Sequence, residues 1–167
     1  DDSTRVRAEY ATDASNYRVI PQVVVFPRDT EDVLATLETA RTLGVPVTSR
    51  GAGTSCAGNA VGTGVIIDFS RHLRRIYDID PEAKTARVDP GVVMSDLQAA
   101  ARPHGLRFGP DPSTQNRATF GGMIGNNACG PRAVAYGRTA DNVLAMDVID
   151  GMGRRFTAAQ VSIRSRA

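Results

Sequence analysis

Residues 45–68, VPVTSRGAGTSCAGNAVGTGVIID, place two short apolar runs on either side of a loop rich in glycine. The runs at 45–48 and 65–68 are β-branched and bounded by glycine, as expected for buried strands. Residues 49–64 between them, here called the first glycine loop, are polar and small. The segment therefore predicts two strands joined by a loop whose backbone is accessible to a ligand.

The residues before this segment extend it to a strand–helix–strand unit. Residues 23–26, VVVF, predict a buried strand between two prolines. Asp29 or Thr30 can cap the helix that follows, and Gly44 can end it. The apolar face of that helix is predicted to be Val33, Leu34, Leu37, Ala40 and Leu43. Connections this short favour a parallel pair formed by the strands at 23–26 and 45–48. These elements are predicted to belong to a small parallel βαβ lobe at about 20–70.

The later residues follow a different pattern, that of antiparallel structure. Runs at 76–79 and 85–88 flank a turn sequence, DPEA, and predict a hairpin. Ser95 to Gln98 has the form of a capping box, which would open a helix ending at Gly105. Strands are predicted at 143–149 and 155–157, around a turn at 150–153. The chain is thus expected to be α+β, with a second, mainly antiparallel lobe with helices at about 75–160.

Composition excludes several classes of protein. The 167 residues carry 20 basic and 18 acidic side chains, a net charge of +2, which is too small to indicate nucleic-acid binding. Two cysteines and two histidines, His72 and His104, give no disulfide scaffold, zinc site or iron–sulfur site. No apolar run approaches the roughly 18 residues of a membrane span, and the first residues do not form a signal peptide. We expect a cytoplasmic location, no metal, and no role for either histidine.

The first glycine loop has the residue types that a pyrophosphate requires. Glycines allow backbone N–H groups to turn toward an anion, while Thr54 and Ser55 add hydroxyl donors and Arg50 adds a charge. No Lys-Ser or Lys-Thr follows the glycines, so this is not a Walker loop. Cys56 stands where the Rossmann fingerprint requires glycine. Spacing alone leaves a flexible surface loop as the alternative. If the loop cradles a pyrophosphate, Gly53→Asp should weaken binding and leave the fold intact.

A second glycine-rich stretch, residues 109–137, has little regular pattern. It contains Pro110-Asp111-Pro112-Ser113-Thr114 and then TFGGMIGNNACG at residues 119–130. Twelve nearly uncharged residues rich in glycine and asparagine suit close contact with a flat neutral ring, because asparagine offers both donor and acceptor. The alternative is a tightly packed helix start at which glycine permits close approach.

Several motifs, in order, resemble the PCMH-type FAD-binding domain of the vanillyl-alcohol oxidase superfamily. They are RGAGTS at 50–55, PDPST at 110–114, GGMIGNNACG at 121–130 and YGRTADNV at 136–143, together with YATDAS at 10–15. Within that superfamily the chain is most similar to the branch of glycolate oxidase, D-lactate dehydrogenase and D-2-hydroxyglutarate dehydrogenase. The resemblance covers nearly the whole chain, so residues 1–167 are expected to be one such domain.

This resemblance implies a cofactor and its site. FAD would lie between the two lobes, with the first glycine loop around the pyrophosphate and the second stretch along the ribityl chain and isoalloxazine. Many covalent members attach FAD through a histidine where Thr54 stands here, so the flavin is expected to be held non-covalently. The cofactor-binding residues implied are Arg50, Gly51, Ala52, Gly53, Thr54, Ser55, Gly58, Asn59, Pro110, Asp111, Ser113, Thr114, Gly121, Gly122, Gly125 and Asn126.

The resemblance also implies an activity, oxidation of a 2-hydroxy acid such as D-lactate or glycolate by hydride transfer to flavin N5. Relatives place the substrate in a second, cap domain that this chain does not include, so the chain alone is expected to be inactive, and no catalytic residue is assigned. The electron acceptor would be a protein or a membrane-associated molecule, with the enzyme peripheral to the inner membrane. The alternatives are a non-catalytic nucleotide-binding module and a same-fold flavin reductase of cell-wall precursors.

Overall fold

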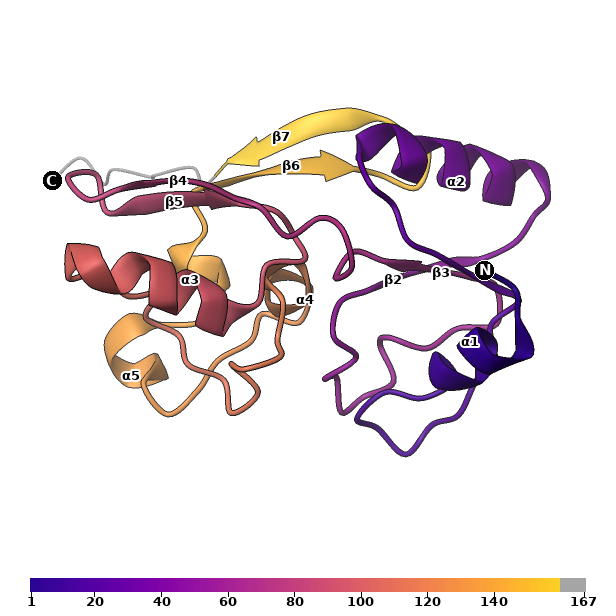
Figure 1. Cartoon of the computed structure of the whole chain (residues 1–167), viewed down its shortest axis with the longest axis horizontal. Coiled ribbons are helices and arrows are strands. Elements are labelled where there is room, and N and C mark those ends of the chain that lie inside the picture. The colour runs from indigo at the N-terminus through magenta and orange to yellow at the C-terminus, as the bar shows by residue number, and fades with distance from the viewer. Residues whose placement is uncertain (160–167) are drawn as a thin grey trace, which may run out of the picture.

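A three-stranded parallel sheet forms the first lobe of the computed structural model, which describes residues 1–159 (Figure 1). Its strands are β1 (Val23–Val25), β2 (Val47–Arg50) and β3 (Val65–Asp68), in the order β1-β3-β2. The predicted direct pairing of β1 with β2 is wrong, because β3 lies between them and pairs with both in parallel. All four residues of β3 are buried. The run at 65–68 therefore occupies the central position of the sheet, where both faces are covered.

Helix α2 (Thr30–Thr42) packs on this sheet and begins as the sequence predicts. The Asp29 side chain accepts a hydrogen bond from Asp32 N at 2.9 Å and caps the helix. Val33 and Ala40 are buried, and Ala40 packs in the cluster that contains Val65 and Ile67 of the sheet. Leu43 is 69% exposed, so its assignment to the apolar face is wrong. It is the C-cap residue, directly after the last helical residue, Thr42. Helix α1 (Thr4–Glu9) lies on the other side of the sheet (Figure 1).

Two separate antiparallel hairpins form the second lobe. Strands β4 (Ile76–Asp80) and β5 (Thr85–Val88) pair with each other, as do β6 (Ala145–Ile149) and β7 (Arg155–Ala159). The Asp80 carboxylate accepts hydrogen bonds from Glu82 N and Ala83 N, both at 2.9 Å, and so fixes the first turn. The predicted antiparallel character and both hairpins are confirmed. Strand β7 runs two residues beyond its predicted end at residue 157.

The helix in the second lobe starts one residue before the predicted capping box. α3 (Met94–Ala101) has Val93 at its N-cap without a side-chain hydrogen bond, so Ser95 lies inside the helix. Gln98, the other end of the predicted box, instead pairs with the backbone of Phe108, donating at 2.9 Å and accepting at 3.0 Å. This tertiary contact replaces the local one. The short 3₁₀ helix η1 (Arg102–His104) continues α3 to Gly105, the predicted end, where φ is +69°.

The second glycine-rich stretch is more regular than predicted. It contains helices α4 (Phe120–Gly125) and α5 (Ala133–Tyr136), and the 3₁₀ helix η2 (Ala140–Asn142) follows it. Phe120 and Met123 of α4 are buried in the core of the second lobe with Val92, Met94 and Leu97. The packed helix start, left open as an alternative above, therefore describes residues 120–125.

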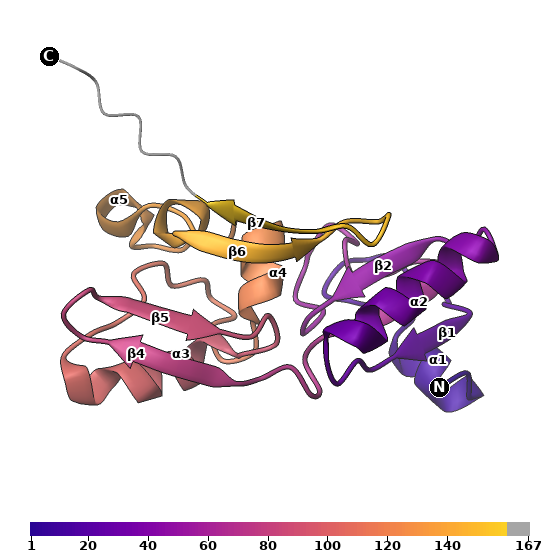
Figure 2. The ribbon, with the colours of Figure 1, turned by 90° about the horizontal axis from the view of Figure 1, so that it is seen from above.

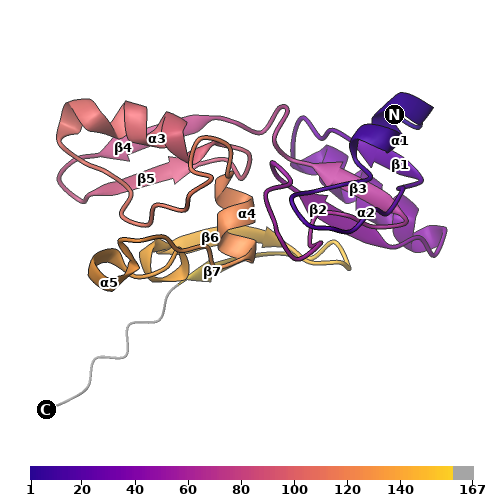
Figure 3. The same ribbon diagram turned by 90° about the horizontal axis from the view of Figure 1, so that it is seen from below.

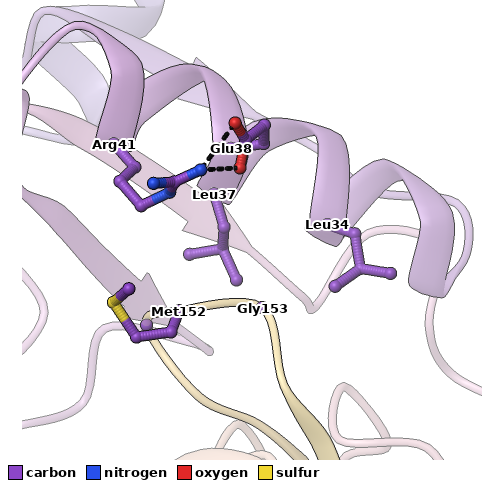
Figure 4. A pocket seen from close by; sticks show the side chains of 7 residues that line it. Leu34, Leu37, Glu38, Arg41, Met152 and Gly153 are labelled. Carbon is purple, nitrogen blue, oxygen red and sulfur yellow. Dashed lines mark hydrogen bonds and ion pairs between the residues drawn. The ribbon is translucent and has the colours of Figure 1, made fainter.

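The two lobes lie side by side along the long axis of the molecule, with α4 near their junction (Figures 2 and 3). The turn of the β6–β7 hairpin reaches back to α2, and Arg155 forms an ion pair with Glu31 at 2.5 Å. Leu34, Leu37 and Met152 line a cavity of about 190 Å³ there, with the Glu38–Arg41 ion pair beside it (Figure 4). This volume is below the usual range for ligand pockets. The contact holds the lobes together without offering a ligand site.

Candidate functional site

A larger cavity of about 310 Å³ lies where the first glycine loop faces the second stretch. This volume is at the lower end of the range for ligand sites, so the cavity could enclose part of a dinucleotide. Many of the predicted cofactor-binding residues line it. They are Gly51, Ala52, Gly53, Thr54, Ser55, Asn59, Thr114, Gly122 and Asn126. The structure thus brings the two glycine-rich segments, more than forty residues apart in sequence, to opposite walls of one site.

The backbone of the first glycine loop offers unused donors. Within residues 1–159, no backbone carbonyl or side chain accepts a hydrogen bond from the N–H groups of residues 52–56. Residues 53–55 are only half-exposed, and backbone donors in such positions usually have a partner. A run of amides without protein acceptors beside a cavity is typical of anion-binding loops.

Two contacts join the loop to the opposite wall. A Cβ at Gly51 would overlap the Thr119 hydroxyl, so only glycine allows the loop to approach residue 119 this closely. Asn59 Nδ2 donates to Asn126 Oδ1 at 2.9 Å across the site. The walls of the cavity are therefore fixed relative to each other at two points.

Gly53 needs glycine for two reasons that the sequence does not reveal. Its φ is +65°, and a Cβ there would lie 2.5 Å from Nη2 of Arg50. Its carbonyl also accepts from Ala14 N at 3.0 Å. Gly53→Asp would therefore strain the loop as well as add charge, and the expectation that it leaves the structure intact does not suit this geometry. Ala52, which already carries a Cβ and is exposed, is the better position for a charge.

Arg50 does not line the cavity. Its guanidinium donates to Thr12 O at 2.9 Å, Ala60 O at 3.0 Å and Tyr10 O at 3.4 Å, and stacks 4.8 Å from the centroid of the Tyr10 ring. Burial lowers the pKa of Arg50 below its ordinary value, although nearby Asp68 and Asp13 partly offset this. The guanidinium is thus occupied by backbone carbonyls of residues 10, 12 and 60.

The remaining predicted residues lie around the cavity lining. Gly58 has φ +76° and packs on the ring of Tyr17, Gly121 donates to Pro90 O at 2.8 Å, and Pro110 is fully buried. Asp111 pairs with Arg132 at 3.2 Å. Ser113 and Gly125 are exposed. None of these is among the lining residues, so their roles as cofactor ligands remain predictions.

The cavity also uses residues that were not among the predicted cofactor-binding set. Ser49, Cys56, Ala57, Ala60, Ala118, Thr119, Met123 and Ala128 complete its lining. Thr119 is 2% exposed and lies beside both Gly51 and Gly122. Its place two residues before the glycine pair Gly121-Gly122 was the available signal. The alanines carry no such signal.

The lining is uncharged throughout. An anion here would be held by amides and hydroxyls. Among residues 1–159, no group of three or more His, Cys, Asp or Glu side chains is placed to hold a metal ion.

Comparison with known proteins identifies the family of the chain. The sequence model of the FAD binding domain family matches residues 21–159, and the chain belongs to that family. It is 45% identical over 143 residues to D-2-hydroxyglutarate dehydrogenase of Pseudomonas putida, covering 84% of this chain and 14% of that protein. It is 40% identical over 141 residues to glycolate oxidase subunit GlcD of Escherichia coli K12, covering 82% and 28%. The sequence resemblance stated above is thereby confirmed.

Solved structures show the same fold at low sequence identity. 6-Hydroxy-D-nicotine oxidase of Arthrobacter nicotinovorans superposes with a TM-score of 0.82 at 23% identity, over 95% of this chain and 34% of that one. An alkyldihydroxyacetonephosphate synthase superposes with a TM-score of 0.83 at 19% identity, over 99% and 33%. The α+β fold of PCMH-type FAD enzymes is thus confirmed. The chain spans only 14–32% of the length of its curated relatives. Within residues 1–159, no helix has the length and apolarity needed to cross a membrane.

Proposed function

We propose that the chain holds FAD non-covalently in the cavity between its two glycine-rich walls. The observation that carries this proposal is the run of free amides at residues 52–56 on one wall, facing an uncharged wall of small residues on the other. A pyrophosphate matches the first wall, and a neutral ring matches the second. The lobe boundaries at about 20–70 and 75–160 are part of this proposal.

The residues of the chain would bind and orient the cofactor. The amides of residues 52–56 and the hydroxyls of Thr54 and Ser55 would donate to the phosphates. The floor of the cavity would be formed by Gly122 and the buried Thr119 and Met123. A larger residue at position 122 would fill part of the space for the cofactor. Bound FAD would supply the redox chemistry, as acceptor of a hydride at N5.

The whole enzyme would act on a 2-hydroxy acid. This follows from relatives named D-2-hydroxyglutarate dehydrogenase, glycolate oxidase subunit GlcD and D-lactate dehydrogenase. Substrate would bind only with residues outside this chain, so the 167-residue chain alone should not reduce a dye with D-lactate or glycolate. Electrons would pass to a protein or to a membrane-associated acceptor. The enzyme would then be cytoplasmic and would reach such an acceptor from the periphery of the inner membrane.

The mode of attachment gives a direct test. Thr54 cannot form the link that a histidine makes, so we expect acid precipitation of the flavin-loaded chain to release all flavin fluorescence into the supernatant. Flavin that stays with the pellet would show a covalent bond. A colourless chain that binds ATP and not FAD would instead support the non-catalytic nucleotide-binding module.

A further inference from the structure

The segment at residues 10–17 makes repeated contacts with the first glycine loop. It lies before residue 21, where the match to the FAD binding domain family begins. Resting on the proposed function, we infer that this segment and Arg50 form a clamp that holds the loop in its cofactor-binding conformation. Arg50 is then a positioning residue and not a ligand of the phosphates.

The guanidinium of Arg50 is committed to this clamp. Its Nη1 and Nη2 donate to three carbonyls that belong to residues 10, 12 and 60, and its face lies over the Tyr10 ring. Within residues 1–159 it forms no ion pair with a carboxylate. A planar fork can bridge carbonyls from separate segments in one geometry, which a lysine ammonium at the end of a flexible chain cannot reproduce.

The other side of the clamp is made by the N-terminal segment itself. Ala14 N donates to Gly53 O at 3.0 Å, and the Asp13 carboxylate accepts from Ala60 N at 3.2 Å. Burial would raise the pKa of Asp13, but hydrogen bonds from Ser15 and Ala60, with the nearby Arg50 charge, lower it below its ordinary value. Asp13 is therefore ionised at neutral pH and acts as a fixed acceptor.

Tyr10 anchors the clamp to the sheet. Its hydroxyl donates to Asp68, the last residue of the central strand β3, and burial raises the pKa of Tyr10 well above its ordinary value. Ser70 N and Oγ also donate to Asp68, at 2.7 Å and 2.6 Å. The loop is thus held at residues 50, 53 and 60 by a segment that is itself fixed to the core.

The clamp is tested with two variants, Arg50→Lys and Asp13→Asn, and with Arg41→Lys as the matched control. Arg41 is an exposed arginine on α2 whose only ion pair is with Glu38 among the described residues. Each flavin-free protein is examined by amide hydrogen exchange, and each is titrated with FAD and with riboflavin, which lacks phosphates. A general loss of stability weakens both ligands alike, whereas a displaced phosphate loop weakens FAD alone.

We expect both variants to speed exchange in peptides covering residues 10–17 and 58–62 before any flavin is added. We also expect FAD affinity to fall about tenfold, with riboflavin affinity unchanged, since at least one charge-assisted contact to the loop is lost. Arg41→Lys should change neither. Asp13→Asn keeps the test decisive if Arg50→Lys does not fold.

Three results would overturn the clamp. If Arg50→Lys weakens FAD binding while exchange is normal and Asp13→Asn binds FAD normally, Arg50 contacts the cofactor directly. If exchange rises while FAD affinity is unchanged, the segment does not position the loop. If the unaltered protein binds no FAD, the proposed function fails and the clamp has no cofactor to position, a result distinct from the first two.

Discussion

Ala52→Asp should weaken FAD binding about a hundredfold. Ala52 is exposed, lines the cavity and follows Gly51, so a carboxylate there would lie beside the proposed phosphates. Hydrogen bonds to a charged group contribute roughly 1.5–3 kcal/mol each. Two or more such bonds from the loop would hold the pyrophosphate, and the new carboxylate would repel the same phosphates. A loss of about 2.7 kcal/mol corresponds to a hundredfold change in dissociation constant. The measurement is a titration of flavin-free protein with FAD.

Ala52→Asn separates charge from size in this experiment. Asparagine has nearly the shape of aspartate and no charge, so it should retain most of the affinity. Circular dichroism of both variants checks that the fold is unchanged. Equal dissociation constants for Ala52→Asp and the unaltered protein would place the phosphates elsewhere, and equal losses in both variants would show that the loop excludes any larger side chain.

Ile67→Ala should destabilise the chain by about 3 kcal/mol. Ile67 is 1% exposed on the central strand β3 and packs in a cluster with Val65 and Ala40 of α2, bordered by Leu37 and Phe69. Truncating a buried isoleucine to alanine costs about 2–5 kcal/mol, because transfer energy is lost and a cavity remains. For a chain of this size, that loss corresponds to a fall of roughly 6–12 °C in Tm.

Ile20→Ala is the matched control for this prediction. Ile20 is 52% exposed and lies before β1, so the same truncation there should change the free energy of unfolding by less than about 1 kcal/mol. Chemical denaturation of both variants gives the comparison. Equal effects at the two positions would mean that β3 is not the centre of the first lobe.

Local patterns were sufficient for most of the secondary structure. The β-branched runs gave β1 and β3, the Asp29 cap and Gly44 bounded α2 closely, and the turn sequence DPEA gave the first hairpin. The order of the sheet could not be derived in this way. Chain proximity favoured β1 beside β2, but β3 lies between them and pairs with both in parallel. Gln98 shows the same limit, since its partner is the backbone of Phe108 and not its own helix.

The site was predictable in part. Glycine spacing identified the loop that lines the cavity, because glycine is needed where backbone approaches a ligand. The direction of a side chain was not predictable. Arg50 ends strand β2 and precedes the glycines, as a phosphate ligand would, yet its guanidinium donates to the carbonyls of residues 10 and 12. That choice depends on a segment forty residues earlier in the chain, which no local pattern encodes.

The position of β3 between β1 and β2 also sets the order in which the first lobe can form. Neither outer strand has a partner until β3 has been made, so β1 and β2 must wait for a strand later in the chain. Strands β2 and β3 are parallel neighbours, so the chain must cross over between them. The first glycine loop is that connection. The sheet is therefore complete only when the loop that forms one wall of the cavity has closed. Doubling the length of such a loop costs only about 0.6 kcal/mol in closure entropy, so folding tolerates insertions there that ligand binding would not.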